Sequence, residues 1–140
     1  MSRVYLLDTN VLSEPLRVSP DEGILEALRA HEGEIATATP VWHELWFGCA
    51  RLRRSRRRTL IETYLRDVVA ASLPILPYDQ DAAAWHASKR ARLSSRGRTP
   101  PFVDGQIAAI AATNDLVLVT SNIADFKSFK GLRVEDWRSA

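Results

Sequence analysis

The chain has 140 residues, of which 46% are hydrophobic and 26% charged, with a formal net charge of +2 at pH 7. This balance excludes a disordered or fibrous polypeptide, so we expect a single globular domain spanning residues 1–140. The lone Cys49 excludes an internal disulfide, and neither a signal peptide nor a membrane-spanning apolar stretch is found, so we expect a cytoplasmic protein with no membrane partner.

Five short apolar runs predict strands at residues 4–7, 35–37, 74–77, 116–120 and 132–134. The strongest of them are apolar throughout instead of alternating, which is typical of strands buried on both faces of a parallel sheet. Helical patterns lie between them. The alternation predicts an α/β fold: a three-layer α/β/α sandwich with a short, mostly parallel central sheet.

The first helix is predicted near Ser13, which can cap it, and a second covers roughly residues 21–31. A third is expected to start at Pro40, and its charged continuation leads into another helical stripe, formed by Leu60, Ile61, Tyr64, Leu65 and Val68. A fourth starts after Asp79 or Asp81 and reaches residue 93. Residues 94–101 then form a loop, and the last helix covers residues 104–113.

Acidic and amide side chains recur where the apolar runs end. Asp8 follows the first strand, Glu44 comes after the second, and Asp104 opens the last helix, while Asn122 and Asp125 follow the strand at 116–120. In an open α/β sheet these positions meet at the carboxyl edge, where sites are built. Taken singly, Asp8 can be a turn cap, Glu44 a solvent-facing side chain and Asp104 a helix cap.

Those separate roles do not explain why three acids fall at one edge of the sheet. Clustered carboxylates repel one another unless a cation neutralises them, and Mg²⁺ or Mn²⁺ suits oxygen ligands. Such an ion activates water for phosphodiester hydrolysis. A phosphatase mechanism through an aspartyl-phosphate is disfavoured, because Asn10 stands where its second acid is needed.

Basic residues form two groups, one between Arg51 and Arg58 and one between Lys89 and Arg98. Either group can attract phosphate backbones, or can simply be a solvated helix face. The candidate contacts are Arg53, Arg54, Arg57, Arg96 and Arg98. His31, His43 and His86 show no metal-ligand spacing, and we assign them no catalytic role.

Four segments in this order resemble PIN-domain ribonucleases, and most of all the VapC-type toxins of bacterial type II toxin–antitoxin systems. They are LLDTNVLS (6–13), HELWFG (43–48), VDGQIAAIA (103–111) and LVTSN (118–122) followed by Asp125, and the ending GLRVEDW (131–137) is also similar. The resemblance covers essentially the whole chain. It implies a PIN-like sandwich and a metal-dependent endoribonuclease that cleaves structured RNA.

The resemblance also implies roles for individual residues. Asp8, Glu44 and Asp104 match the acids that hold Mg²⁺ or Mn²⁺ in the family. Thr9 and Asn10 would fix Asp8. The auxiliary positions are Thr120 and Ser121, which could bind a metal-bound water or a phosphate, and Asn122, with Asp125 three residues on, where many members have a fourth acid. The implied partners are a cognate VapB-type antitoxin, an RNA substrate and a second copy of the chain in a homodimer.

Two other functions stay open at this level. The segment at residues 7–17 also resembles a family member described as a subunit of a DNA-bound regulatory complex with little nuclease activity. A metal-dependent DNA nuclease would use the same acids. The intact acids favour the ribonuclease over a pure binding module.

Overall fold

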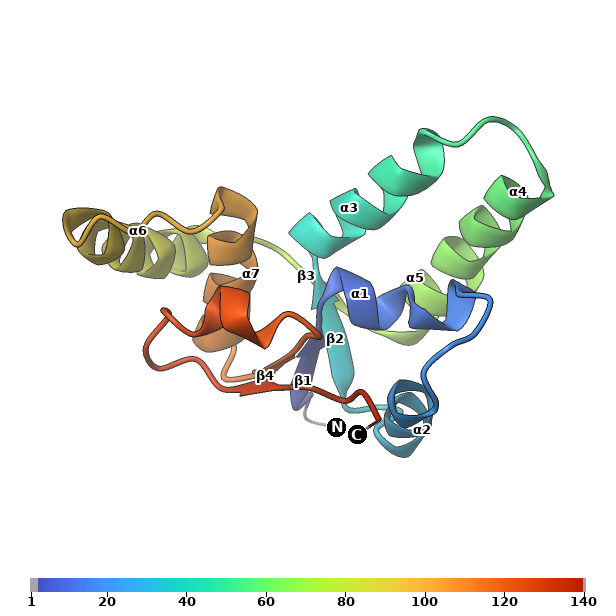
Figure 1. Cartoon of the computed structure of the whole chain (residues 1–140), viewed down its shortest axis with the longest axis horizontal. Coiled ribbons are helices and arrows are strands. Elements are labelled where there is room, and N and C mark those ends of the chain that lie inside the picture. The colour runs from blue at the N-terminus through green and yellow to red at the C-terminus, as the bar shows by residue number, and fades with distance from the viewer. Residues whose placement is uncertain (1–2, 140) are drawn as a thin grey trace.

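The computed structural model describes residues 3–139, and its centre is a sheet made from the predicted apolar runs (Figure 1). Within those residues the sheet has five strands in the order β3-β2-β1-β4-β5, and every neighbouring pair is parallel. The strands are β1 (Tyr5–Leu7), β2 (Ile35–Ala38), β3 (Ile75–Leu76), β4 (Val117–Val119) and β5 (Val134–Glu135). The α/β fold is therefore confirmed, with a sheet that is parallel throughout.

The path of the chain through the sheet brings two distant segments together. It moves outward from β1 through β2 to β3, and then returns to place β4 on the other side of β1. Leu7 pairs with Val119 in this register. The next residues, Asp8 and Thr120, therefore become neighbours at the carboxyl edge, at the point where the strand order reverses.

Helices flank the sheet on both sides (Figure 1). On one side lie α6 (Gln80–Ser95) and α7 (Phe102–Thr113), with the one-turn η3 (Ile123–Phe126) near them. On the other side lie α1 (Thr9–Leu12), η1 (Glu14–Leu16), α2 (Glu22–Ala30), α4 (Arg56–Thr63), η2 (Tyr64–Val69) and α5 (Ala70–Ser72). The helix α3 (Thr39–Ala50) rises from the carboxyl edge of β2. None of the helices described between residues 3 and 139 is long and apolar enough to cross a membrane.

The first helix starts earlier than the sequence pattern predicted. It begins at Thr9 because Asp8 caps it, accepting a hydrogen bond from the Thr9 N–H. The helical piece predicted after Ser13 is also present, as η1, but the Ser13 side chain does not cap it; its hydroxyl donates to the Thr9 carbonyl at 2.8 Å. At the other end of the chain, α7 begins two residues before Asp104, which therefore lies inside the first turn and is not the cap.

The helix predicted from Pro40 and the helical stripe that follows its charged continuation belong to separate helices in the structure. Val41, Leu45 and Cys49 form the buried face of α3 as expected, but the chain turns at residues 51–55 before α4 begins. Leu60 and Val68 were expected on the inner face, yet they are 56% and 49% exposed. The arginine run has no apolar residue except Leu52, so nothing anchors a continuous helix to the core there.

Leu118 and Leu60 provide a matched test of where the core lies. Leu118 is fully buried in the central strand β4, so Leu118→Ala should lower the free energy of unfolding by about 2–5 kcal/mol. Leu60→Ala removes the same atoms from an exposed position and should change it by only about 0.5 kcal/mol. Urea denaturation measures both. Equal losses would contradict the assignment of Leu60 to the surface.

Candidate functional site

Asp8 is a buried acid whose two carboxylate oxygens both accept hydrogen bonds. It is 7% exposed and lies between the end of β1 and the start of α1. Its Oδ1 accepts a hydrogen bond from the Thr9 N–H at 2.8 Å, and its Oδ2 accepts one from the Thr120 hydroxyl at 2.8 Å. Its own N–H donates to the Val119 carbonyl at 2.9 Å. The carboxylate is therefore fixed from both β1 and β4.

The turn after β4 is tied to the turn after β1 by further hydrogen bonds. Thr120 is fully buried, and its hydroxyl also accepts the Asn122 N–H at 3.0 Å. Asn10 accepts the Ser121 N–H through its Oδ1 at 3.1 Å. Thr9 thus holds Asp8 through its backbone, whereas Asn10 holds the opposite turn. The Thr120 hydroxyl is committed to Asp8 and does not face an open surface.

Asp104 lies in the first turn of α7, half-buried. Burial raises the pKa of its carboxyl to about 6, and the negative charges of Asp8, Asp125 and Glu44 contribute in that order. Burial also raises the pKa of Asp8, against the lowering effect of the hydrogen bonds from Thr120 and Thr9. Asp125 and Glu44 raise it further. Asp8 and Asp104 therefore both lie within the electrostatic influence of Glu44 and Asp125.

Glu44 and Asp125 are the exposed members of this group, which we call the acid cluster: Asp8, Glu44, Asp104 and Asp125. Glu44 projects from α3 and Asp125 from η3. The sequence pattern gave more weight to Glu44, yet Asp125 has the larger electrostatic effect on both Asp8 and Asp104. Asn122 is exposed and makes no side-chain cap to η3. The one-turn helix brings Asp125, three residues later, to the site.

The acid cluster carries negative charge that the protein does not balance. Among residues 3–139, no salt bridge involves any of its four members. In the same described range, no three Asp, Glu, His or Cys side chains are close enough as they stand to hold a metal ion. The four acids thus share one region without converging on one point.

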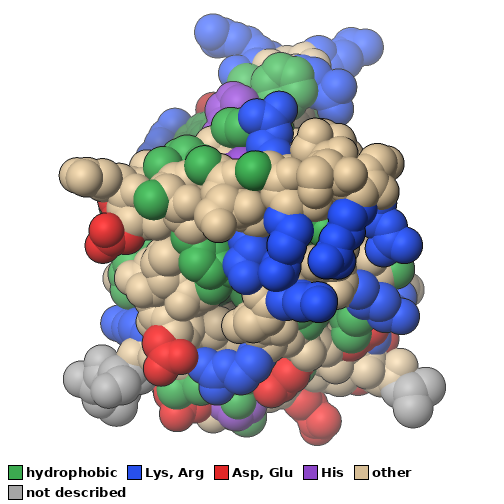
Figure 2. Space-filling view, turned by 90° about the vertical axis from the view of Figure 1, so that its left-hand side faces the viewer, with side chains coloured by type: hydrophobic (Ala, Val, Ile, Leu, Met, Phe, Trp, Pro, Cys, Tyr) green, Lys and Arg blue, Asp and Glu red, His purple; other side chains and the backbone are tan. Residues whose placement is uncertain are grey.

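The predicted basic contacts lie at two separate places. Arg53, Arg54 and Arg57 are exposed at the tip of the α3–α4 hairpin, away from the carboxyl edge of the sheet (Figure 1). Arg96 and Arg98 are exposed in the loop that leads into α7. Figure 2 shows Lys and Arg side chains gathered on the side of the molecule where α6 lies.

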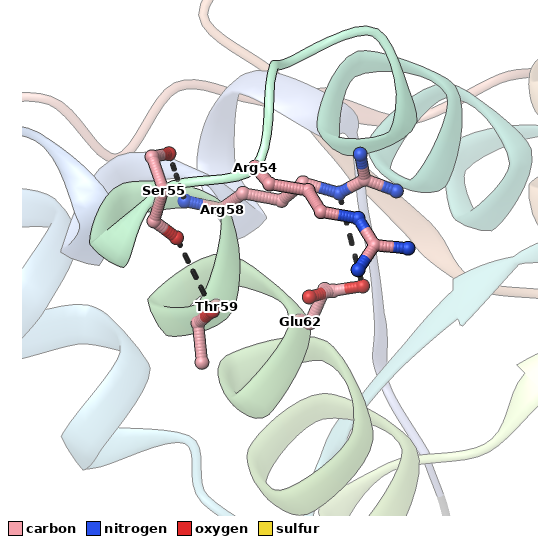
Figure 3. A pocket seen from close by; sticks show the side chains of 5 residues that line it. All are labelled: Arg54, Ser55, Arg58, Thr59 and Glu62. Atoms are coloured by element: carbon pink, nitrogen blue, oxygen red, sulfur yellow. Dashed lines mark hydrogen bonds and ion pairs between the residues drawn. The ribbon is translucent and has the colours of Figure 1, made fainter.

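The hairpin group is partly neutralised. A hollow of about 300 Å³ beside the start of α4 is lined by Arg54, Ser55, Arg58, Thr59 and Glu62 (Figure 3). Ser55 caps α4 by accepting the Arg58 N–H, and Glu62 forms an ion pair of 3.9 Å with Arg58. The arginine run is therefore a mixed-charge surface at this point.

The comparisons with known proteins agree with this fold. Residues 5–132 match the PIN domain. A VapC ribonuclease, Y4jK, from Sinorhizobium fredii is 30% identical, over 98% of this chain and 100% of that protein. A tRNA(fMet)-specific endonuclease VapC from Shigella flexneri is 28% identical, over 95% of this chain and 97% of that protein. The chain belongs to the PIN-domain family, as a ribonuclease toxin of the VapC type.

This chain also resembles chains in solved structures of the VapBC family. DNA-bound VapBC from Salmonella typhimurium has a TM-score of 0.84 at 27% identity, covering 96% of this chain and 98% of that one. VapBC-5, a member of the VapBC family of toxin–antitoxin systems from Mycobacterium tuberculosis, has a TM-score of 0.70 at 29% identity. That match covers 99% of this chain and 98% of the other.

The raised pKa of Asp104 has a consequence for stability. Because the folded metal-free protein holds this proton more tightly than the unfolded chain, with its ordinary pKa of 3.8, Asp104 stabilises the fold less as pH rises from about 4 through about 6. Asp104→Asn removes that dependence. The variant should therefore gain stability relative to the original protein between about pH 4 and pH 7, as measured by urea denaturation with chelator present. If the difference in the free energy of unfolding between the two proteins stayed constant across this pH range, the raised pKa of Asp104 would be contradicted.

Proposed function

We propose that the acid cluster holds Mg²⁺ or Mn²⁺ and that this ion makes the VapC-type toxin a metal-dependent endoribonuclease. The observation that carries the proposal is the set of unbalanced carboxylates at the carboxyl edge of the sheet, which come from the turn after β1 and from three helices. Asp8, Glu44 and Asp104 are the proposed ligands and catalytic residues. Asp125 supplements them from η3, and Asn122 adds an uncharged oxygen beside it.

The donor chemistry fits such an ion. Carboxylate oxygens are hard ligands, and Mg²⁺ is commonly bound by only one or two carboxylates while it keeps several waters. Because no three acids converge as they stand in residues 3–139, Asp8 and Asp104 would be the first ligands, and the exposed Glu44 would join them by a movement of its side chain. When bound, the ion supplies positive charge for the phosphoryl oxygens and an acidified water for the attack on phosphorus.

The protein supplies position and charge. Thr120 and the Thr9 N–H hold both oxygens of Asp8, so this carboxylate presents a fixed anchor. Burial of Asp104 makes its ionised form costly, and a cation offsets that cost. Glu44 and Asp125 are exposed, so their side chains can adjust toward an ion at little cost.

Structured RNA is the substrate that we propose. One relative is named for cleavage of tRNA(fMet), which supports a folded RNA with an accessible loop. Residues 1–140 would act as a single PIN domain, in the cytoplasm, where a free cysteine such as the buried Cys49 stays reduced.

We also propose that a VapB-type antitoxin neutralises the chain and that two copies pair within the complex. Similar proteins occur in toxin–antitoxin complexes, and one such complex is bound to DNA. This supports a second function, as a subunit of a DNA-bound regulatory complex. The two functions are compatible if the antitoxin makes the DNA contacts. A DNA nuclease is the remaining alternative, and competition between RNA and DNA substrates distinguishes it.

Removing the proposed ligands tests the nuclease. Asp8→Asn and Asp104→Asn should each lower RNA cleavage in Mg²⁺ by at least about 100-fold, since loss of a ligand exceeds the usual effect of losing an outer partner. Chelation should abolish cleavage and added Mn²⁺ should restore it. Asp67→Asn, in η2 and exposed, is the matched control and should cleave normally. Full cleavage by Asp104→Asn would exclude the mechanism. Growth arrest on expression of the original protein that Asp104→Asn relieves would support the nuclease, whereas no arrest by the original protein would favour the regulatory function.

The two arginine groups can be ranked by their effect on RNA affinity. Arg96 and Arg98 precede the helix that carries Asp104, whereas Arg53 and Arg54 lie at the hairpin tip. We expect the double alanine variant at 96 and 98 to weaken RNA binding more, and to reduce the salt slope by about 1.4 for two lost phosphate contacts. Binding titrations across a salt series measure this slope. If the double alanine variant at 53 and 54 loses more RNA affinity than the variant at 96 and 98, the hairpin group makes the stronger RNA contacts and the expected ranking is wrong.

A further inference from the structure

A buried histidine outside the acid cluster packs against the helix that carries Asp104. His86, in α6, is only 3% exposed. The Tyr78 hydroxyl, from the segment between β3 and α6, lies 2.8 Å from its Nδ1. Burial, and to a smaller extent the charge of Arg90, lower the pKa of this imidazole, which favours the neutral ring. A neutral ring that is hydrogen-bonded at one nitrogen has a defined orientation.

The opposite side of the imidazole lies against the backbone of α7. A Cβ built on Gly105 would come within 2.0 Å of His86 Nε2, closer than any real contact. Glycine is therefore required at this position because the ring occupies the space of a side chain. The Phe102 ring lies 4.8 Å from the imidazole, between centroids, so His86 contacts the first turn of α7 at two residues that flank Asp104.

This first turn has no side-chain cap, although the Arg90 guanidinium also lies over the Phe102 ring at 5.2 Å. The residue at its N-cap is Pro101, and no side chain caps the exposed N–H groups. By contrast, α2 and α6 each begin at an aspartate whose side chain caps the helix. In α7 the first turn has the lateral packing contact with His86 instead.

We propose that His86, oriented by Tyr78, is a positioning residue that sets where α7 presents Asp104 to a divalent cation. This inference rests on the proposed function, because it takes Asp104 as a ligand. His86 does not meet substrate or ion; it acts through Gly105 and Phe102. Its loss lets the first turn shift, and the cation then meets a displaced carboxylate.

Calorimetric titration of Mn²⁺ into the metal-free full chain tests this without any measurement of cleavage. His86→Ala should weaken Mn²⁺ binding by about 10-fold, the lower end of what a lost supporting partner costs. Gly105→Ala should weaken it similarly, because the new methyl displaces the ring. In the double variant the smaller residue at 86 leaves room for that methyl, so binding should be no weaker than in His86→Ala alone.

Controls separate positioning from general stability. Leu93→Ala removes a buried side chain from the same helix and should lower the melting temperature while Mn²⁺ affinity stays within about twofold. His86→Asn keeps a polar atom near Nδ1 and should recover part of the affinity. Tyr78→Phe loses only the hydroxyl and should weaken Mn²⁺ binding, by less than His86→Ala does. This variant decides the matter if His86→Ala does not fold.

The outcomes for the two proposals differ. If the original protein binds Mn²⁺ and Asp104→Asn does not, the metal site stands, and equal affinities for His86→Ala, Tyr78→Phe and the original protein would overturn the positioning role. The positioning role would also be wrong if the losses of Mn²⁺ affinity in His86→Ala and Gly105→Ala multiplied in the double variant. If Asp104→Asn binds Mn²⁺ as the original protein does, the metal site itself is wrong and the role of His86 falls with it.

Discussion

The hydrogen bond from the Thr120 hydroxyl to Asp8 joins the two strands on which the site depends. Leu7 pairs with Val119, so the residues that follow them face each other where the strand order reverses. A buried carboxylate needs donors, and here one comes from its own turn and one from the neighbouring strand. A slip of this register would separate the two residues. The position of the Asp8 carboxylate therefore depends on the register between β1 and β4.

Around this anchor the fold gathers charge that it does not neutralise. Asp104 sits where burial and three neighbouring carboxylates disfavour its ionised form. A protein selected only for stability would place a cation or an apolar residue there. The arrangement costs stability at neutral pH, and strongly perturbed groups of this kind concentrate at functional sites. A ligand that supplies positive charge would offset the cost.

Whether a feature could be predicted from the sequence depends on whether it arises from neighbouring residues or from residues far apart in the chain. The buried strands were predicted because apolar runs report burial directly, and Asp8 and Asp104 were predicted because they follow or begin such elements. The exposure of Leu60 was missed because a helical stripe carries no information on whether the helix reaches the core. The contact between His86 and Gly105 joins two helices, and no local pattern records it.

The acid cluster has a fixed part and an adjustable part. Asp8 is buried and held by two hydrogen bonds, and Asp104 is half-buried on a helix packed against His86. Glu44 and Asp125 are exposed, and exposed side chains change rotamer readily. Since no three acids converge as they stand in residues 3–139, any closer approach to a shared ion must come chiefly from the exposed pair. The buried pair would then set where the ion lies, and the exposed pair how tightly it is held.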